Sequence, residues 1–190
     1  MLLAGLTGGL ASGKSFIASQ MRALGCVVIE ADELGHAALQ PGGEAHDEVL
    51  KQFGTVDRPA LASLVFSDPE ALARLNAIVH PAVRRLLKAE INRQDPHAVV
   101  VYVAAILIES GGYRDCDKLI LASCPREQQI ARALARPGAT EAGVLARLAS
   151  QMPLESKLKY ADYIIDTSGT KEETIGQTKM VVEDLRRLAS

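Results

Sequence analysis

A glycine-rich run near the amino terminus has the residue spacing with the most specific chemistry in this sequence. Residues 8–15 read GGLASGKS, which fits the pattern GxxxxGK[ST]. Glycines let successive backbone amides turn inward around an anion, and the lysine and hydroxyl residue that follow supply a positive charge and a metal ligand. The run therefore predicts a loop that holds a polyphosphate, with a nucleoside triphosphate as the expected ligand.

The segments on both sides of this run support that interpretation. A strand is expected over Leu2–Leu6 and a helix over Lys14–Leu24, whose amino terminus would direct its amides and positive dipole end at the phosphates. Lys14 is expected to neutralise the outer phosphates, and Ser15 to ligate Mg²⁺. The alternative, a turn that only caps a helix, fits less well because the whole motif and both flanks agree. The expected nucleotide-binding residues are Gly8, Gly9, Leu10, Ala11, Ser12, Gly13, Lys14, Ser15 and Phe16.

Asp32, in the stretch VVIEADELGH, is a candidate catalytic residue. It follows the expected strand Val27–Glu30, and open α/β sheets gather their ligands at the carboxyl ends of their strands. A carboxylate there could accept the proton of a hydroxyl that attacks a γ-phosphorus, or steer Mg²⁺ through a water. The alternative is that Asp32 caps the helix that follows it. Spacing alone leaves these two roles equally supported.

Arginines are the third chemical element, because a phosphoryl transition state spreads negative charge over oxygens that guanidinium groups bind well. The candidates between residues 126 and 159 are Arg132, Arg136 and Arg147, with Lys157 nearby. Most surface arginines are only solvated, so we expect one or two of these to act at the site. Arg136 is favoured because it adjoins a predicted turn.

Two further polar residues have roles that the sequence leaves open. Glu109 ends the longest apolar run and is either a second carboxylate of the site or an ordinary polar strand end. His80 precedes Pro81 and lies near Arg84, and no other metal ligands stand at suitable spacing, so a structural or hydrogen-bonding role is expected. His80 and Arg84 would contact a substrate only if their segment faces the ligand crevice.

The elements that must position these residues are short apolar strands separated by helical patterns. This alternation predicts an α/β fold with a five-stranded parallel sheet covered on both faces. The expected strands are Leu2–Leu6, Val27–Glu30, Val99–Leu107, Leu119–Ala122 and Tyr163–Asp166. A last helix, over Lys171–Leu188, is expected to pack back onto the sheet.

The chain is expected to form one domain, residues 1–190, whose core is interrupted by two helical excursions. Prolines punctuate the first excursion, and at Asp68-Pro69 and His80-Pro81 each is expected to start a helix or to break one before it. The second excursion is expected to be a mobile flap that excludes water from the ligand. The expected parts are a core (1–32, 96–125 and 160–190), a helical substrate-binding insertion (33–95) and a lid region (126–159).

Composition excludes several function classes. The 21 basic and 23 acidic residues are interspersed and aromatic residues make up 4%, so nucleic acid is not expected as a partner. Cys26, Cys116 and Cys124 are odd in number and show no CxxC pattern, which favours a reducing, cytoplasmic location. The longest apolar run, residues 98–108, is too short to span a bilayer, so no membrane contact is expected. No obligate protein partner is evident either.

The order of the motifs along nearly the whole chain resembles the dephospho-coenzyme A kinase family. The segments that carry the resemblance include GLTGGLASGKS, VIEADELGH, HPAVR, ILIESG, QMPLESK and ADYIID. The loop alone is shared with many unrelated nucleotide binders, whereas the HPAVR and QMPLESK…ADYIID segments are far more particular. The resemblance implies a P-loop NTPase three-layer fold with a core, a helical substrate domain and a lid. It also implies that ATP, with Mg²⁺, phosphorylates the ribose 3′-hydroxyl of dephospho-coenzyme A in the last step of coenzyme A synthesis.

The resemblance also implies roles for individual residues. Asp32 becomes the expected base, while Lys14 and Arg136 join it as the catalytic set. Arg136 and Arg147 become contacts to phosphates from the lid. The turn over Asp166–Gly169 falls where the family tends to hold adenine, so Arg136 and Gly169 are added to the nucleotide-binding residues. The expected acceptor-binding residues are Thr7, Asp32, His80, Arg84, Glu109 and Arg147.

The sequence departs from the family pattern at several places. The family usually has Asp-Ala-Asp where Glu30-Ala31-Asp32 stands, and the second acid, which we assign to catalysis, is retained. The stretch Val103–Glu109 lacks the usual Asp and Pro, and Arg136-Pro137-Gly138 replaces the commoner Arg-Asp-Gly. Two other functions stay open on sequence alone: another small-molecule kinase, for a nucleoside monophosphate or a sugar, and a module that binds ATP without transfer.

Overall fold

The structure is a computed structural model of the chain, and it describes residues 1–65 and 68–189. Phe66 and Ser67, within the expected insertion, and Ser190, the last residue of the expected core, lie outside the described residues.

The chain divides into two compact units. The first consists of Met1–Val28 and Asp95–Ser190, and it contains the phosphate-loop motif. The second, Ile29–Gln94, is mainly helical. Each unit is described by itself.

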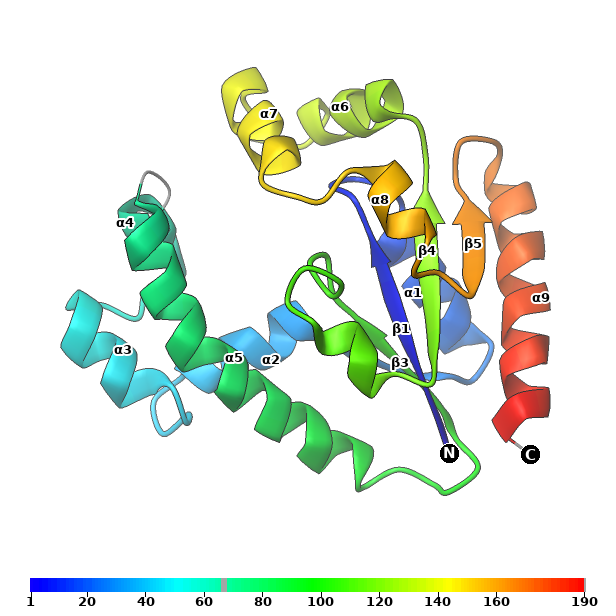
Figure 1. The fold of residues 1–190 in the computed structure, drawn as a ribbon, viewed down its shortest axis with the longest axis horizontal. Helices are drawn as coiled ribbons and strands as arrows, with labels where there is room; N and C mark the ends of the chain where they lie inside the picture. Colours follow the sequence, from blue (N-terminus) through cyan, green and yellow to red (C-terminus); the bar gives the residue numbers. More distant parts are fainter. Residues whose placement is uncertain (66–67, 190) are drawn as a thin grey trace. The chain divides into compact units, whose positions relative to one another are not determined.

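A five-stranded parallel sheet organises the first unit, with strand order β2-β3-β1-β4-β5. Figure 1 shows β3, β1, β4 and β5 in this order. The strands are β1 (Leu2–Gly8), β2 (Val27–Glu30), β3 (Val99–Val103), β4 (Lys118–Ser123) and β5 (Tyr163–Asp166). The central strand β1 pairs in parallel with β3, where Leu2 lies opposite Val99, and with β4, where Gly8 lies opposite Ala122. Every residue of β1 and of β3 is buried, as expected for a sheet covered on both faces. The predicted α/β fold is confirmed.

The third strand is shorter than the sequence predicts. We expected it to run to Leu107, but β3 ends at Val103, and Ala104 makes the last amide bond along this edge, to the Leu6 carbonyl at 3.0 Å. Residues 105–110 form turns instead. Leu107 and Ile108 are nonetheless buried, at 1% and 5% exposed. The prediction was wrong because an apolar run of this length does not distinguish a strand from a buried turn.

In its described residues, the first unit contains five α-helices. They are α1 (Lys14–Ala23), α6 (Arg126–Leu134), α7 (Glu141–Ala149), α8 (Leu154–Leu158) and α9 (Lys171–Ala189), with a short 3₁₀ helix η1 at Gly112–Asp115. Of these, α1 and α9 share the core of the sheet. The main core joins β1 to α1 and α9 through side chains such as Leu6, Ile17, Met21 and Leu185, each of them fully buried. Burial of several large aliphatic side chains, about 1.5–3 kcal/mol each, anchors α1 directly behind the loop that precedes it.

The segment expected to be a lid, residues 126–159, contains α6, α7 and α8. A turn at Pro137–Gly138 separates α6 from α7, and Gly138 adopts the left-handed conformation with φ 73°. Thr140 caps α7, since its hydroxyl accepts the Gly143 amide at 3.2 Å. α6 and α7 pack on each other and on Ala11 of the loop, through Ala133 and Val144.

The second unit consists mainly of α2 (Ala31–Leu39), α3 (His46–Phe53), α4 (Arg58–Val65) and α5 (Pro69–Ile91). It has a small core of its own, formed by residues such as Leu39, Val49, Leu61 and Ala82. Each of these helices has an apolar face, and the helices cover one another's apolar faces by packing together.

The sequence predicted a helix boundary at each of two prolines, Pro69 and Pro81, and the structure confirms only the first. Asp68 caps the helix, its carboxylate accepting the Glu70 and Ala71 amides at 2.9 Å each, and Pro69 is at the start as expected. Pro81 was expected to mark a helix boundary, but it lies inside α5. The prediction was wrong because the residues that follow Pro81 are buried against the other helices, and this packing outweighs one missing amide bond.

No helix within residues 1–65 and 68–189 has both the length and the apolar character needed to cross a membrane.

Candidate active site

The phosphate loop connects β1 to α1 at the carboxyl edge of the sheet. Gly13 precedes the helix with φ 89°, and the Ser12 amide closes the loop on the Gly9 carbonyl at 3.2 Å. In the part of the chain that the structure describes, no protein acceptor takes the amides of Ala11, Gly13 or Ser15. Unpaired donors at the start of a helix are what an anion-binding site provides.

Lys14 brings a positive charge into the same loop. Its ammonium donates to the Gly8 carbonyl at 2.9 Å and to the Gly9 carbonyl at 2.7 Å. The stem of Lys14 therefore folds back along the loop, and the charge lies beside the backbone that would surround a phosphate. Ser15 follows in the first turn of α1 and is exposed. The two residues present an ammonium and a hydroxyl from consecutive positions.

Two positions between the end of β1 and the start of α1 have left-handed backbone. Gly13 is one, and a Cβ added there would lie 2.9 Å from Cγ2 and 3.1 Å from Oγ1 of Thr167. Ala11 is the other, with φ 54°, and it is the one non-glycine residue with positive φ among the described residues. Its side chain is buried against the lid helices, at 9% exposed. Packing therefore holds Ala11 in a conformation that L-residues rarely adopt.

We predict that Gly13→Ala lowers the free energy of unfolding by about 1–2 kcal/mol, because alanine at this φ is strained and its Cβ meets Thr167. Urea denaturation measures the change. Gly176→Ala, in α9, is the matched control: a Cβ there meets nothing within 4 Å, so the same substitution should stabilise the protein slightly. Equal stability of the two variants would contradict the prediction.

Thr167 lies where the ends of β4 and β5 meet the loop, and sequence reasoning gave it no role. Its hydroxyl lies 2.9 Å from the Ser12 carbonyl and 3.2 Å from the Ser123 carbonyl, within donating distance of both. Arg132, on α6, donates to the Thr167 carbonyl at 2.7 Å and to its hydroxyl at 3.2 Å. The Thr167 side chain therefore supports the phosphate loop from behind, and Arg132 fixes Thr167.

The turn after β5 is closed by its own polar groups. The Asp166 carboxylate accepts the Ser168 amide at 2.8 Å, and Glu173 accepts the Thr170 amide at 2.7 Å. Gly169 lies between them, exposed, and a Cβ there would meet the Glu173 carboxylate. Lys171 follows this turn, and its ammonium lies 5.9 Å from the centroid of the Phe16 ring on α1.

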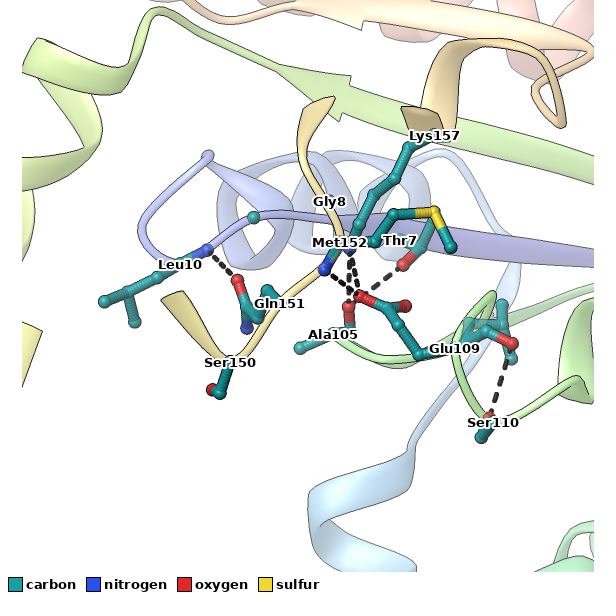
Figure 2. Close-up of polar contacts among 12 residues, drawn as sticks. Thr7, Gly8, Leu10, Ala105, Glu109, Ser110, Ser150, Gln151, Met152 and Lys157 are labelled. Atoms are coloured by element: carbon teal, nitrogen blue, oxygen red, sulfur yellow. Dashed lines mark hydrogen bonds and ion pairs between the residues drawn. The ribbon is translucent and has the colours of Figure 1, made fainter. Parts of the chain in front are cut away.

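A third group of contacts links Glu109 to the segment after α7 (Figure 2). Glu109 Oε1 lies 2.9 Å from the Lys157 ammonium and accepts the Met152 amide at 3.0 Å. Lys157 is 1% exposed and also donates to the Ala105 carbonyl at 3.2 Å. Thr7, fully buried at the end of β1, donates to that same carbonyl at 3.3 Å. Of the expected acceptor-side residues, Thr7 and Glu109 are thus brought together through Ala105 and Lys157.

The charge of Glu109 is stabilised by these partners. Burial raises the pKa of the Glu109 carboxyl, but the hydrogen bonds from Lys157 and from the Met152 amide outweigh burial, and the pKa lies below its usual value. A carboxyl with a lower pKa in the folded state contributes stability above its unfolded pKa, and that stability is lost as the pH falls through the folded pKa.

We therefore predict that stability falls on acidification below about pH 4.3, the usual glutamate pKa, and that Glu109→Gln removes part of that fall. Urea midpoints for both proteins between neutral and acid pH measure it. Parallel pH profiles for wild type and Glu109→Gln would contradict the assignment.

The lid arginines favoured by the sequence are exposed. Arg136 lies in the turn after α6, and Arg147 in the last turn of α7. Within the described residues neither side chain forms an ion pair. Both are therefore available to solvent or to a ligand, in contrast to Arg132.

The remaining expected residues belong to the second unit. Asp32 is exposed and is the second residue of α2, whose N-cap position is Glu30, so the N-cap alternative for Asp32 is wrong. His80 and Arg84 are one turn apart on α5, a spacing that places them on one face. Burial, and then the Arg84 charge, lower the pKa of His80, so its imidazole is neutral at pH 7.

Comparisons with known proteins identify the family to which this chain belongs. The sequence profile of the dephospho-CoA kinase family matches residues 2–173. The chain belongs to this family. A dephospho-CoA kinase from Geobacter metallireducens is 43% identical over 185 residues, which cover 92% of each chain.

Solved structures agree with this membership. A crystal structure of a Thermus thermophilus protein aligns with a TM-score of 0.85 at 35% identity and covers 96% of both chains. The dephospho-CoA kinase from Campylobacter jejuni aligns with a TM-score of 0.72 at 25% identity, covering 99% of this chain and 98% of the other. As a member of a kinase family, the protein uses ATP.

The loop fits the phosphates of ATP. The unpaired amides are donors, Lys14 is a cation, and the Ser12 hydroxyl is buried without a partner among the described residues. A set of three or more metal-ligating side chains is not found in the same residues. A Mg²⁺ ion held by the Ser15 hydroxyl and by phosphate oxygens needs no such set.

Sequence reasoning missed four residues with central contacts: Gln129, Gln151, Thr167 and Lys157, the last noted only as a neighbour of the lid arginines. The Gln129 side chain is 6% exposed and donates to the Cys124 carbonyl at 3.0 Å. Its side-chain oxygen lies 2.5 Å from where a Gly9 Cβ would be. Gln151 and Lys157 begin and end the QMPLESK segment, so the family resemblance marked their positions without indicating their contacts.

Proposed function

We propose that this protein is a dephospho-CoA kinase, transferring the γ-phosphate of ATP to the ribose 3′-hydroxyl of dephospho-CoA in the last step of coenzyme A synthesis. The observation that carries the proposal is the phosphate loop, with unpaired amides and Lys14, in a chain of this family. In the transfer the acceptor oxygen bonds to the γ-phosphorus, the bond to the β-γ bridging oxygen breaks, and ADP leaves.

The loop and the lid would hold the nucleotide. Lys14 exchanges the Gly8 and Gly9 carbonyls for phosphate oxygens, while the loop amides bind the same anion. Ser15 would hold Mg²⁺, which supplies neutralisation of charge on the phosphates when bound. The exposed Arg136 and Arg147 are free to approach the transferred group, and the turn at Gly169 would lie against adenine.

Asp32 would act as the base. Its carboxylate accepts the proton of the 3′-hydroxyl as that oxygen attacks, and its exposed position at the start of α2 leaves it open to a substrate. His80 and Arg84 would bind the acceptor, the neutral imidazole as a hydrogen-bonding group and the guanidinium as a phosphate ligand. In the first unit, Glu109 would contribute to acceptor binding through Oε2, because Oε1 is taken by Lys157 and Met152. Thr7 is fully buried and would act only through the Ala105 carbonyl to which it donates.

We further propose that the enzyme works in the cytoplasm without an obligate protein partner. Free cysteines support a reducing compartment: Cys26 and Cys124 are buried. Burial, together with Asp115 and Asp117, raises the pKa of the Cys116 thiol to about 12, which keeps it protonated and unreactive.

An acceptor panel tests the function. The purified protein is given ATP and Mg²⁺ with dephospho-CoA, nucleoside monophosphates or simple sugars, and both ADP release and the mass of the product are measured. We expect coenzyme A from dephospho-CoA, and much lower turnover of the others. Phosphorylation of a nucleotide or sugar instead would overturn the choice of acceptor, and ATP binding without transfer to any acceptor would overturn the kinase activity.

A further inference from the structure

Gln151 and Met152, which connect α7 to α8, contact two different parts of the first unit (Figure 2). The Gln151 side-chain oxygen accepts the Leu10 amide at 2.9 Å, and Leu10 lies in the phosphate loop. The next amide, that of Met152, donates to Glu109 in the turns after β3. Two consecutive residues therefore join the phosphate loop to those turns.

Lys157 anchors the far side of this connection. Its ammonium lies 2.9 Å from Glu109 Oε1, the same oxygen that accepts the Met152 amide. Because Lys157 is 1% exposed, its ammonium contacts protein groups and does not contact a dissolved ligand directly. The contacts close a ring whose members are Thr7, Leu10, Gln151, Met152, Glu109, Lys157 and Ala105.

The ring restrains the most strained part of the loop. Gln151 fixes the peptide between Gly9 and Leu10, immediately before Ala11 with its φ of 54°. A non-glycine residue keeps such a conformation only when its surroundings determine it. The Ala11 amide, which has no protein acceptor among the described residues, is one of the donors left for phosphate.

We propose that Gln151 is a positioning residue for nucleotide binding, which holds the phosphate loop in its anion-binding conformation, and that Lys157 acts on the nucleotide through Gln151. The proposal rests on the proposed function for the identity of the nucleotide. Lys157 and Glu109 fix Met152, Met152 fixes the neighbouring Gln151, and Gln151 holds the Leu10 amide.

Binding of a non-hydrolysable ATP analogue, measured by calorimetry without acceptor, tests this role. Gln151→Met keeps the length of the side chain and removes the acceptor oxygen, and we expect it to weaken binding about fivefold, the loss of one hydrogen bond. The KM for the acceptor should stay at the wild-type value, and exchange of the Leu10 amide with solvent should become faster. Gln20→Met, on α1, is the matched control and should bind as wild type, since the Gln20 side chain is half-buried and contacts the neighbouring Ser19 hydroxyl at 3.5 Å.

A double-mutant cycle tests the order of action. Lys157→Met should weaken analogue binding by a similar factor in the wild-type background and by almost nothing in Gln151→Met, because its effect passes through Gln151. Lys159→Met, on the exposed surface beside α8, is the control for loss of a lysine. Thermal melts check that each variant is folded, and Gln151→Met alone decides the first claim if Lys157→Met does not fold.

Unchanged affinity in Gln151→Met would overturn the role of Gln151, and additive effects of the two substitutions would overturn the action of Lys157 through it. Because no acceptor is present, a wild-type protein that binds the analogue but does not phosphorylate dephospho-CoA would defeat only the proposed function. A wild-type protein that does not bind the analogue would defeat both.

Discussion

Asp32→Asn is expected to lower kcat by about 10²–10⁴-fold, the usual contribution of a positioned general base, while ATP binding stays at the wild-type level. The substitution removes the proton acceptor but leaves the phosphate loop, which lies in the other unit, intact. Steady-state kinetics with dephospho-CoA and calorimetry with an ATP analogue measure the two quantities separately.

The effect on folding should be small. Asp32 is exposed in the first turn of α2, where a carboxylate contributes about 0.3–1 kcal/mol through the helix dipole. Glu33→Gln, at the next position of the same turn, is the matched control and should leave kcat unchanged. Wild-type turnover by Asp32→Asn would remove Asp32 from the reaction and return the choice of base to the other acceptor-side residues.

Lys14→Ala is expected to lower kcat/KM by about 10²–10³-fold, the usual loss when one group that stabilises developing charge is removed. Unlike Asp32→Asn, it should also weaken binding of the ATP analogue, because the ammonium lies within the loop that receives the phosphates. The two substitutions together therefore separate nucleotide binding from chemistry.

Lys159→Ala controls for the loss of a positive charge, since Lys159 is exposed and faces the Tyr160 ring at 5.2 Å. It should leave both quantities unchanged. Full ATP affinity in Lys14→Ala would show that the loop binds nucleotide without its ammonium, and the assignment of the residue 8–15 loop as the triphosphate site would then fail.

The phosphate loop, the strand positions and the starts of α1, α5 and α9 could be predicted from the sequence because they depend on neighbours in the chain. In GGLASGKS, the glycines that shape the loop and the Lys14 and Ser15 side chains that would act on phosphate lie within eight consecutive residues. Asp68 with Pro69 does the same for the start of α5, where the cap accepts amides only two and three residues ahead. Interactions of such short range survive in any tertiary context that keeps the segment folded.

The end of β3 and the course of α5 depend on packing. The apolar run that contains Leu107 fits a strand and a buried turn equally well, and the structure has the turn. Pro81 ordinarily favours a helix boundary, yet burial of Ala82 and Val83 keeps α5 continuous. At Pro81, contacts from distant segments outweigh a local preference of about 3 kcal/mol. At Leu107, they decide between two conformations that the local sequence does not distinguish.

The sequence by itself determined that this chain carries a phosphate loop on an α/β sheet and resembles one kinase family. Tertiary structure alone decided which side chains support that loop. Thr167 meets Ser12 across 155 residues, Gln151 meets Leu10 across 141, and Lys157 meets Ala105 across 52. No residue pattern encodes such pairs, because they form only when the parallel strands end at a common edge and bring remote segments within hydrogen-bond distance.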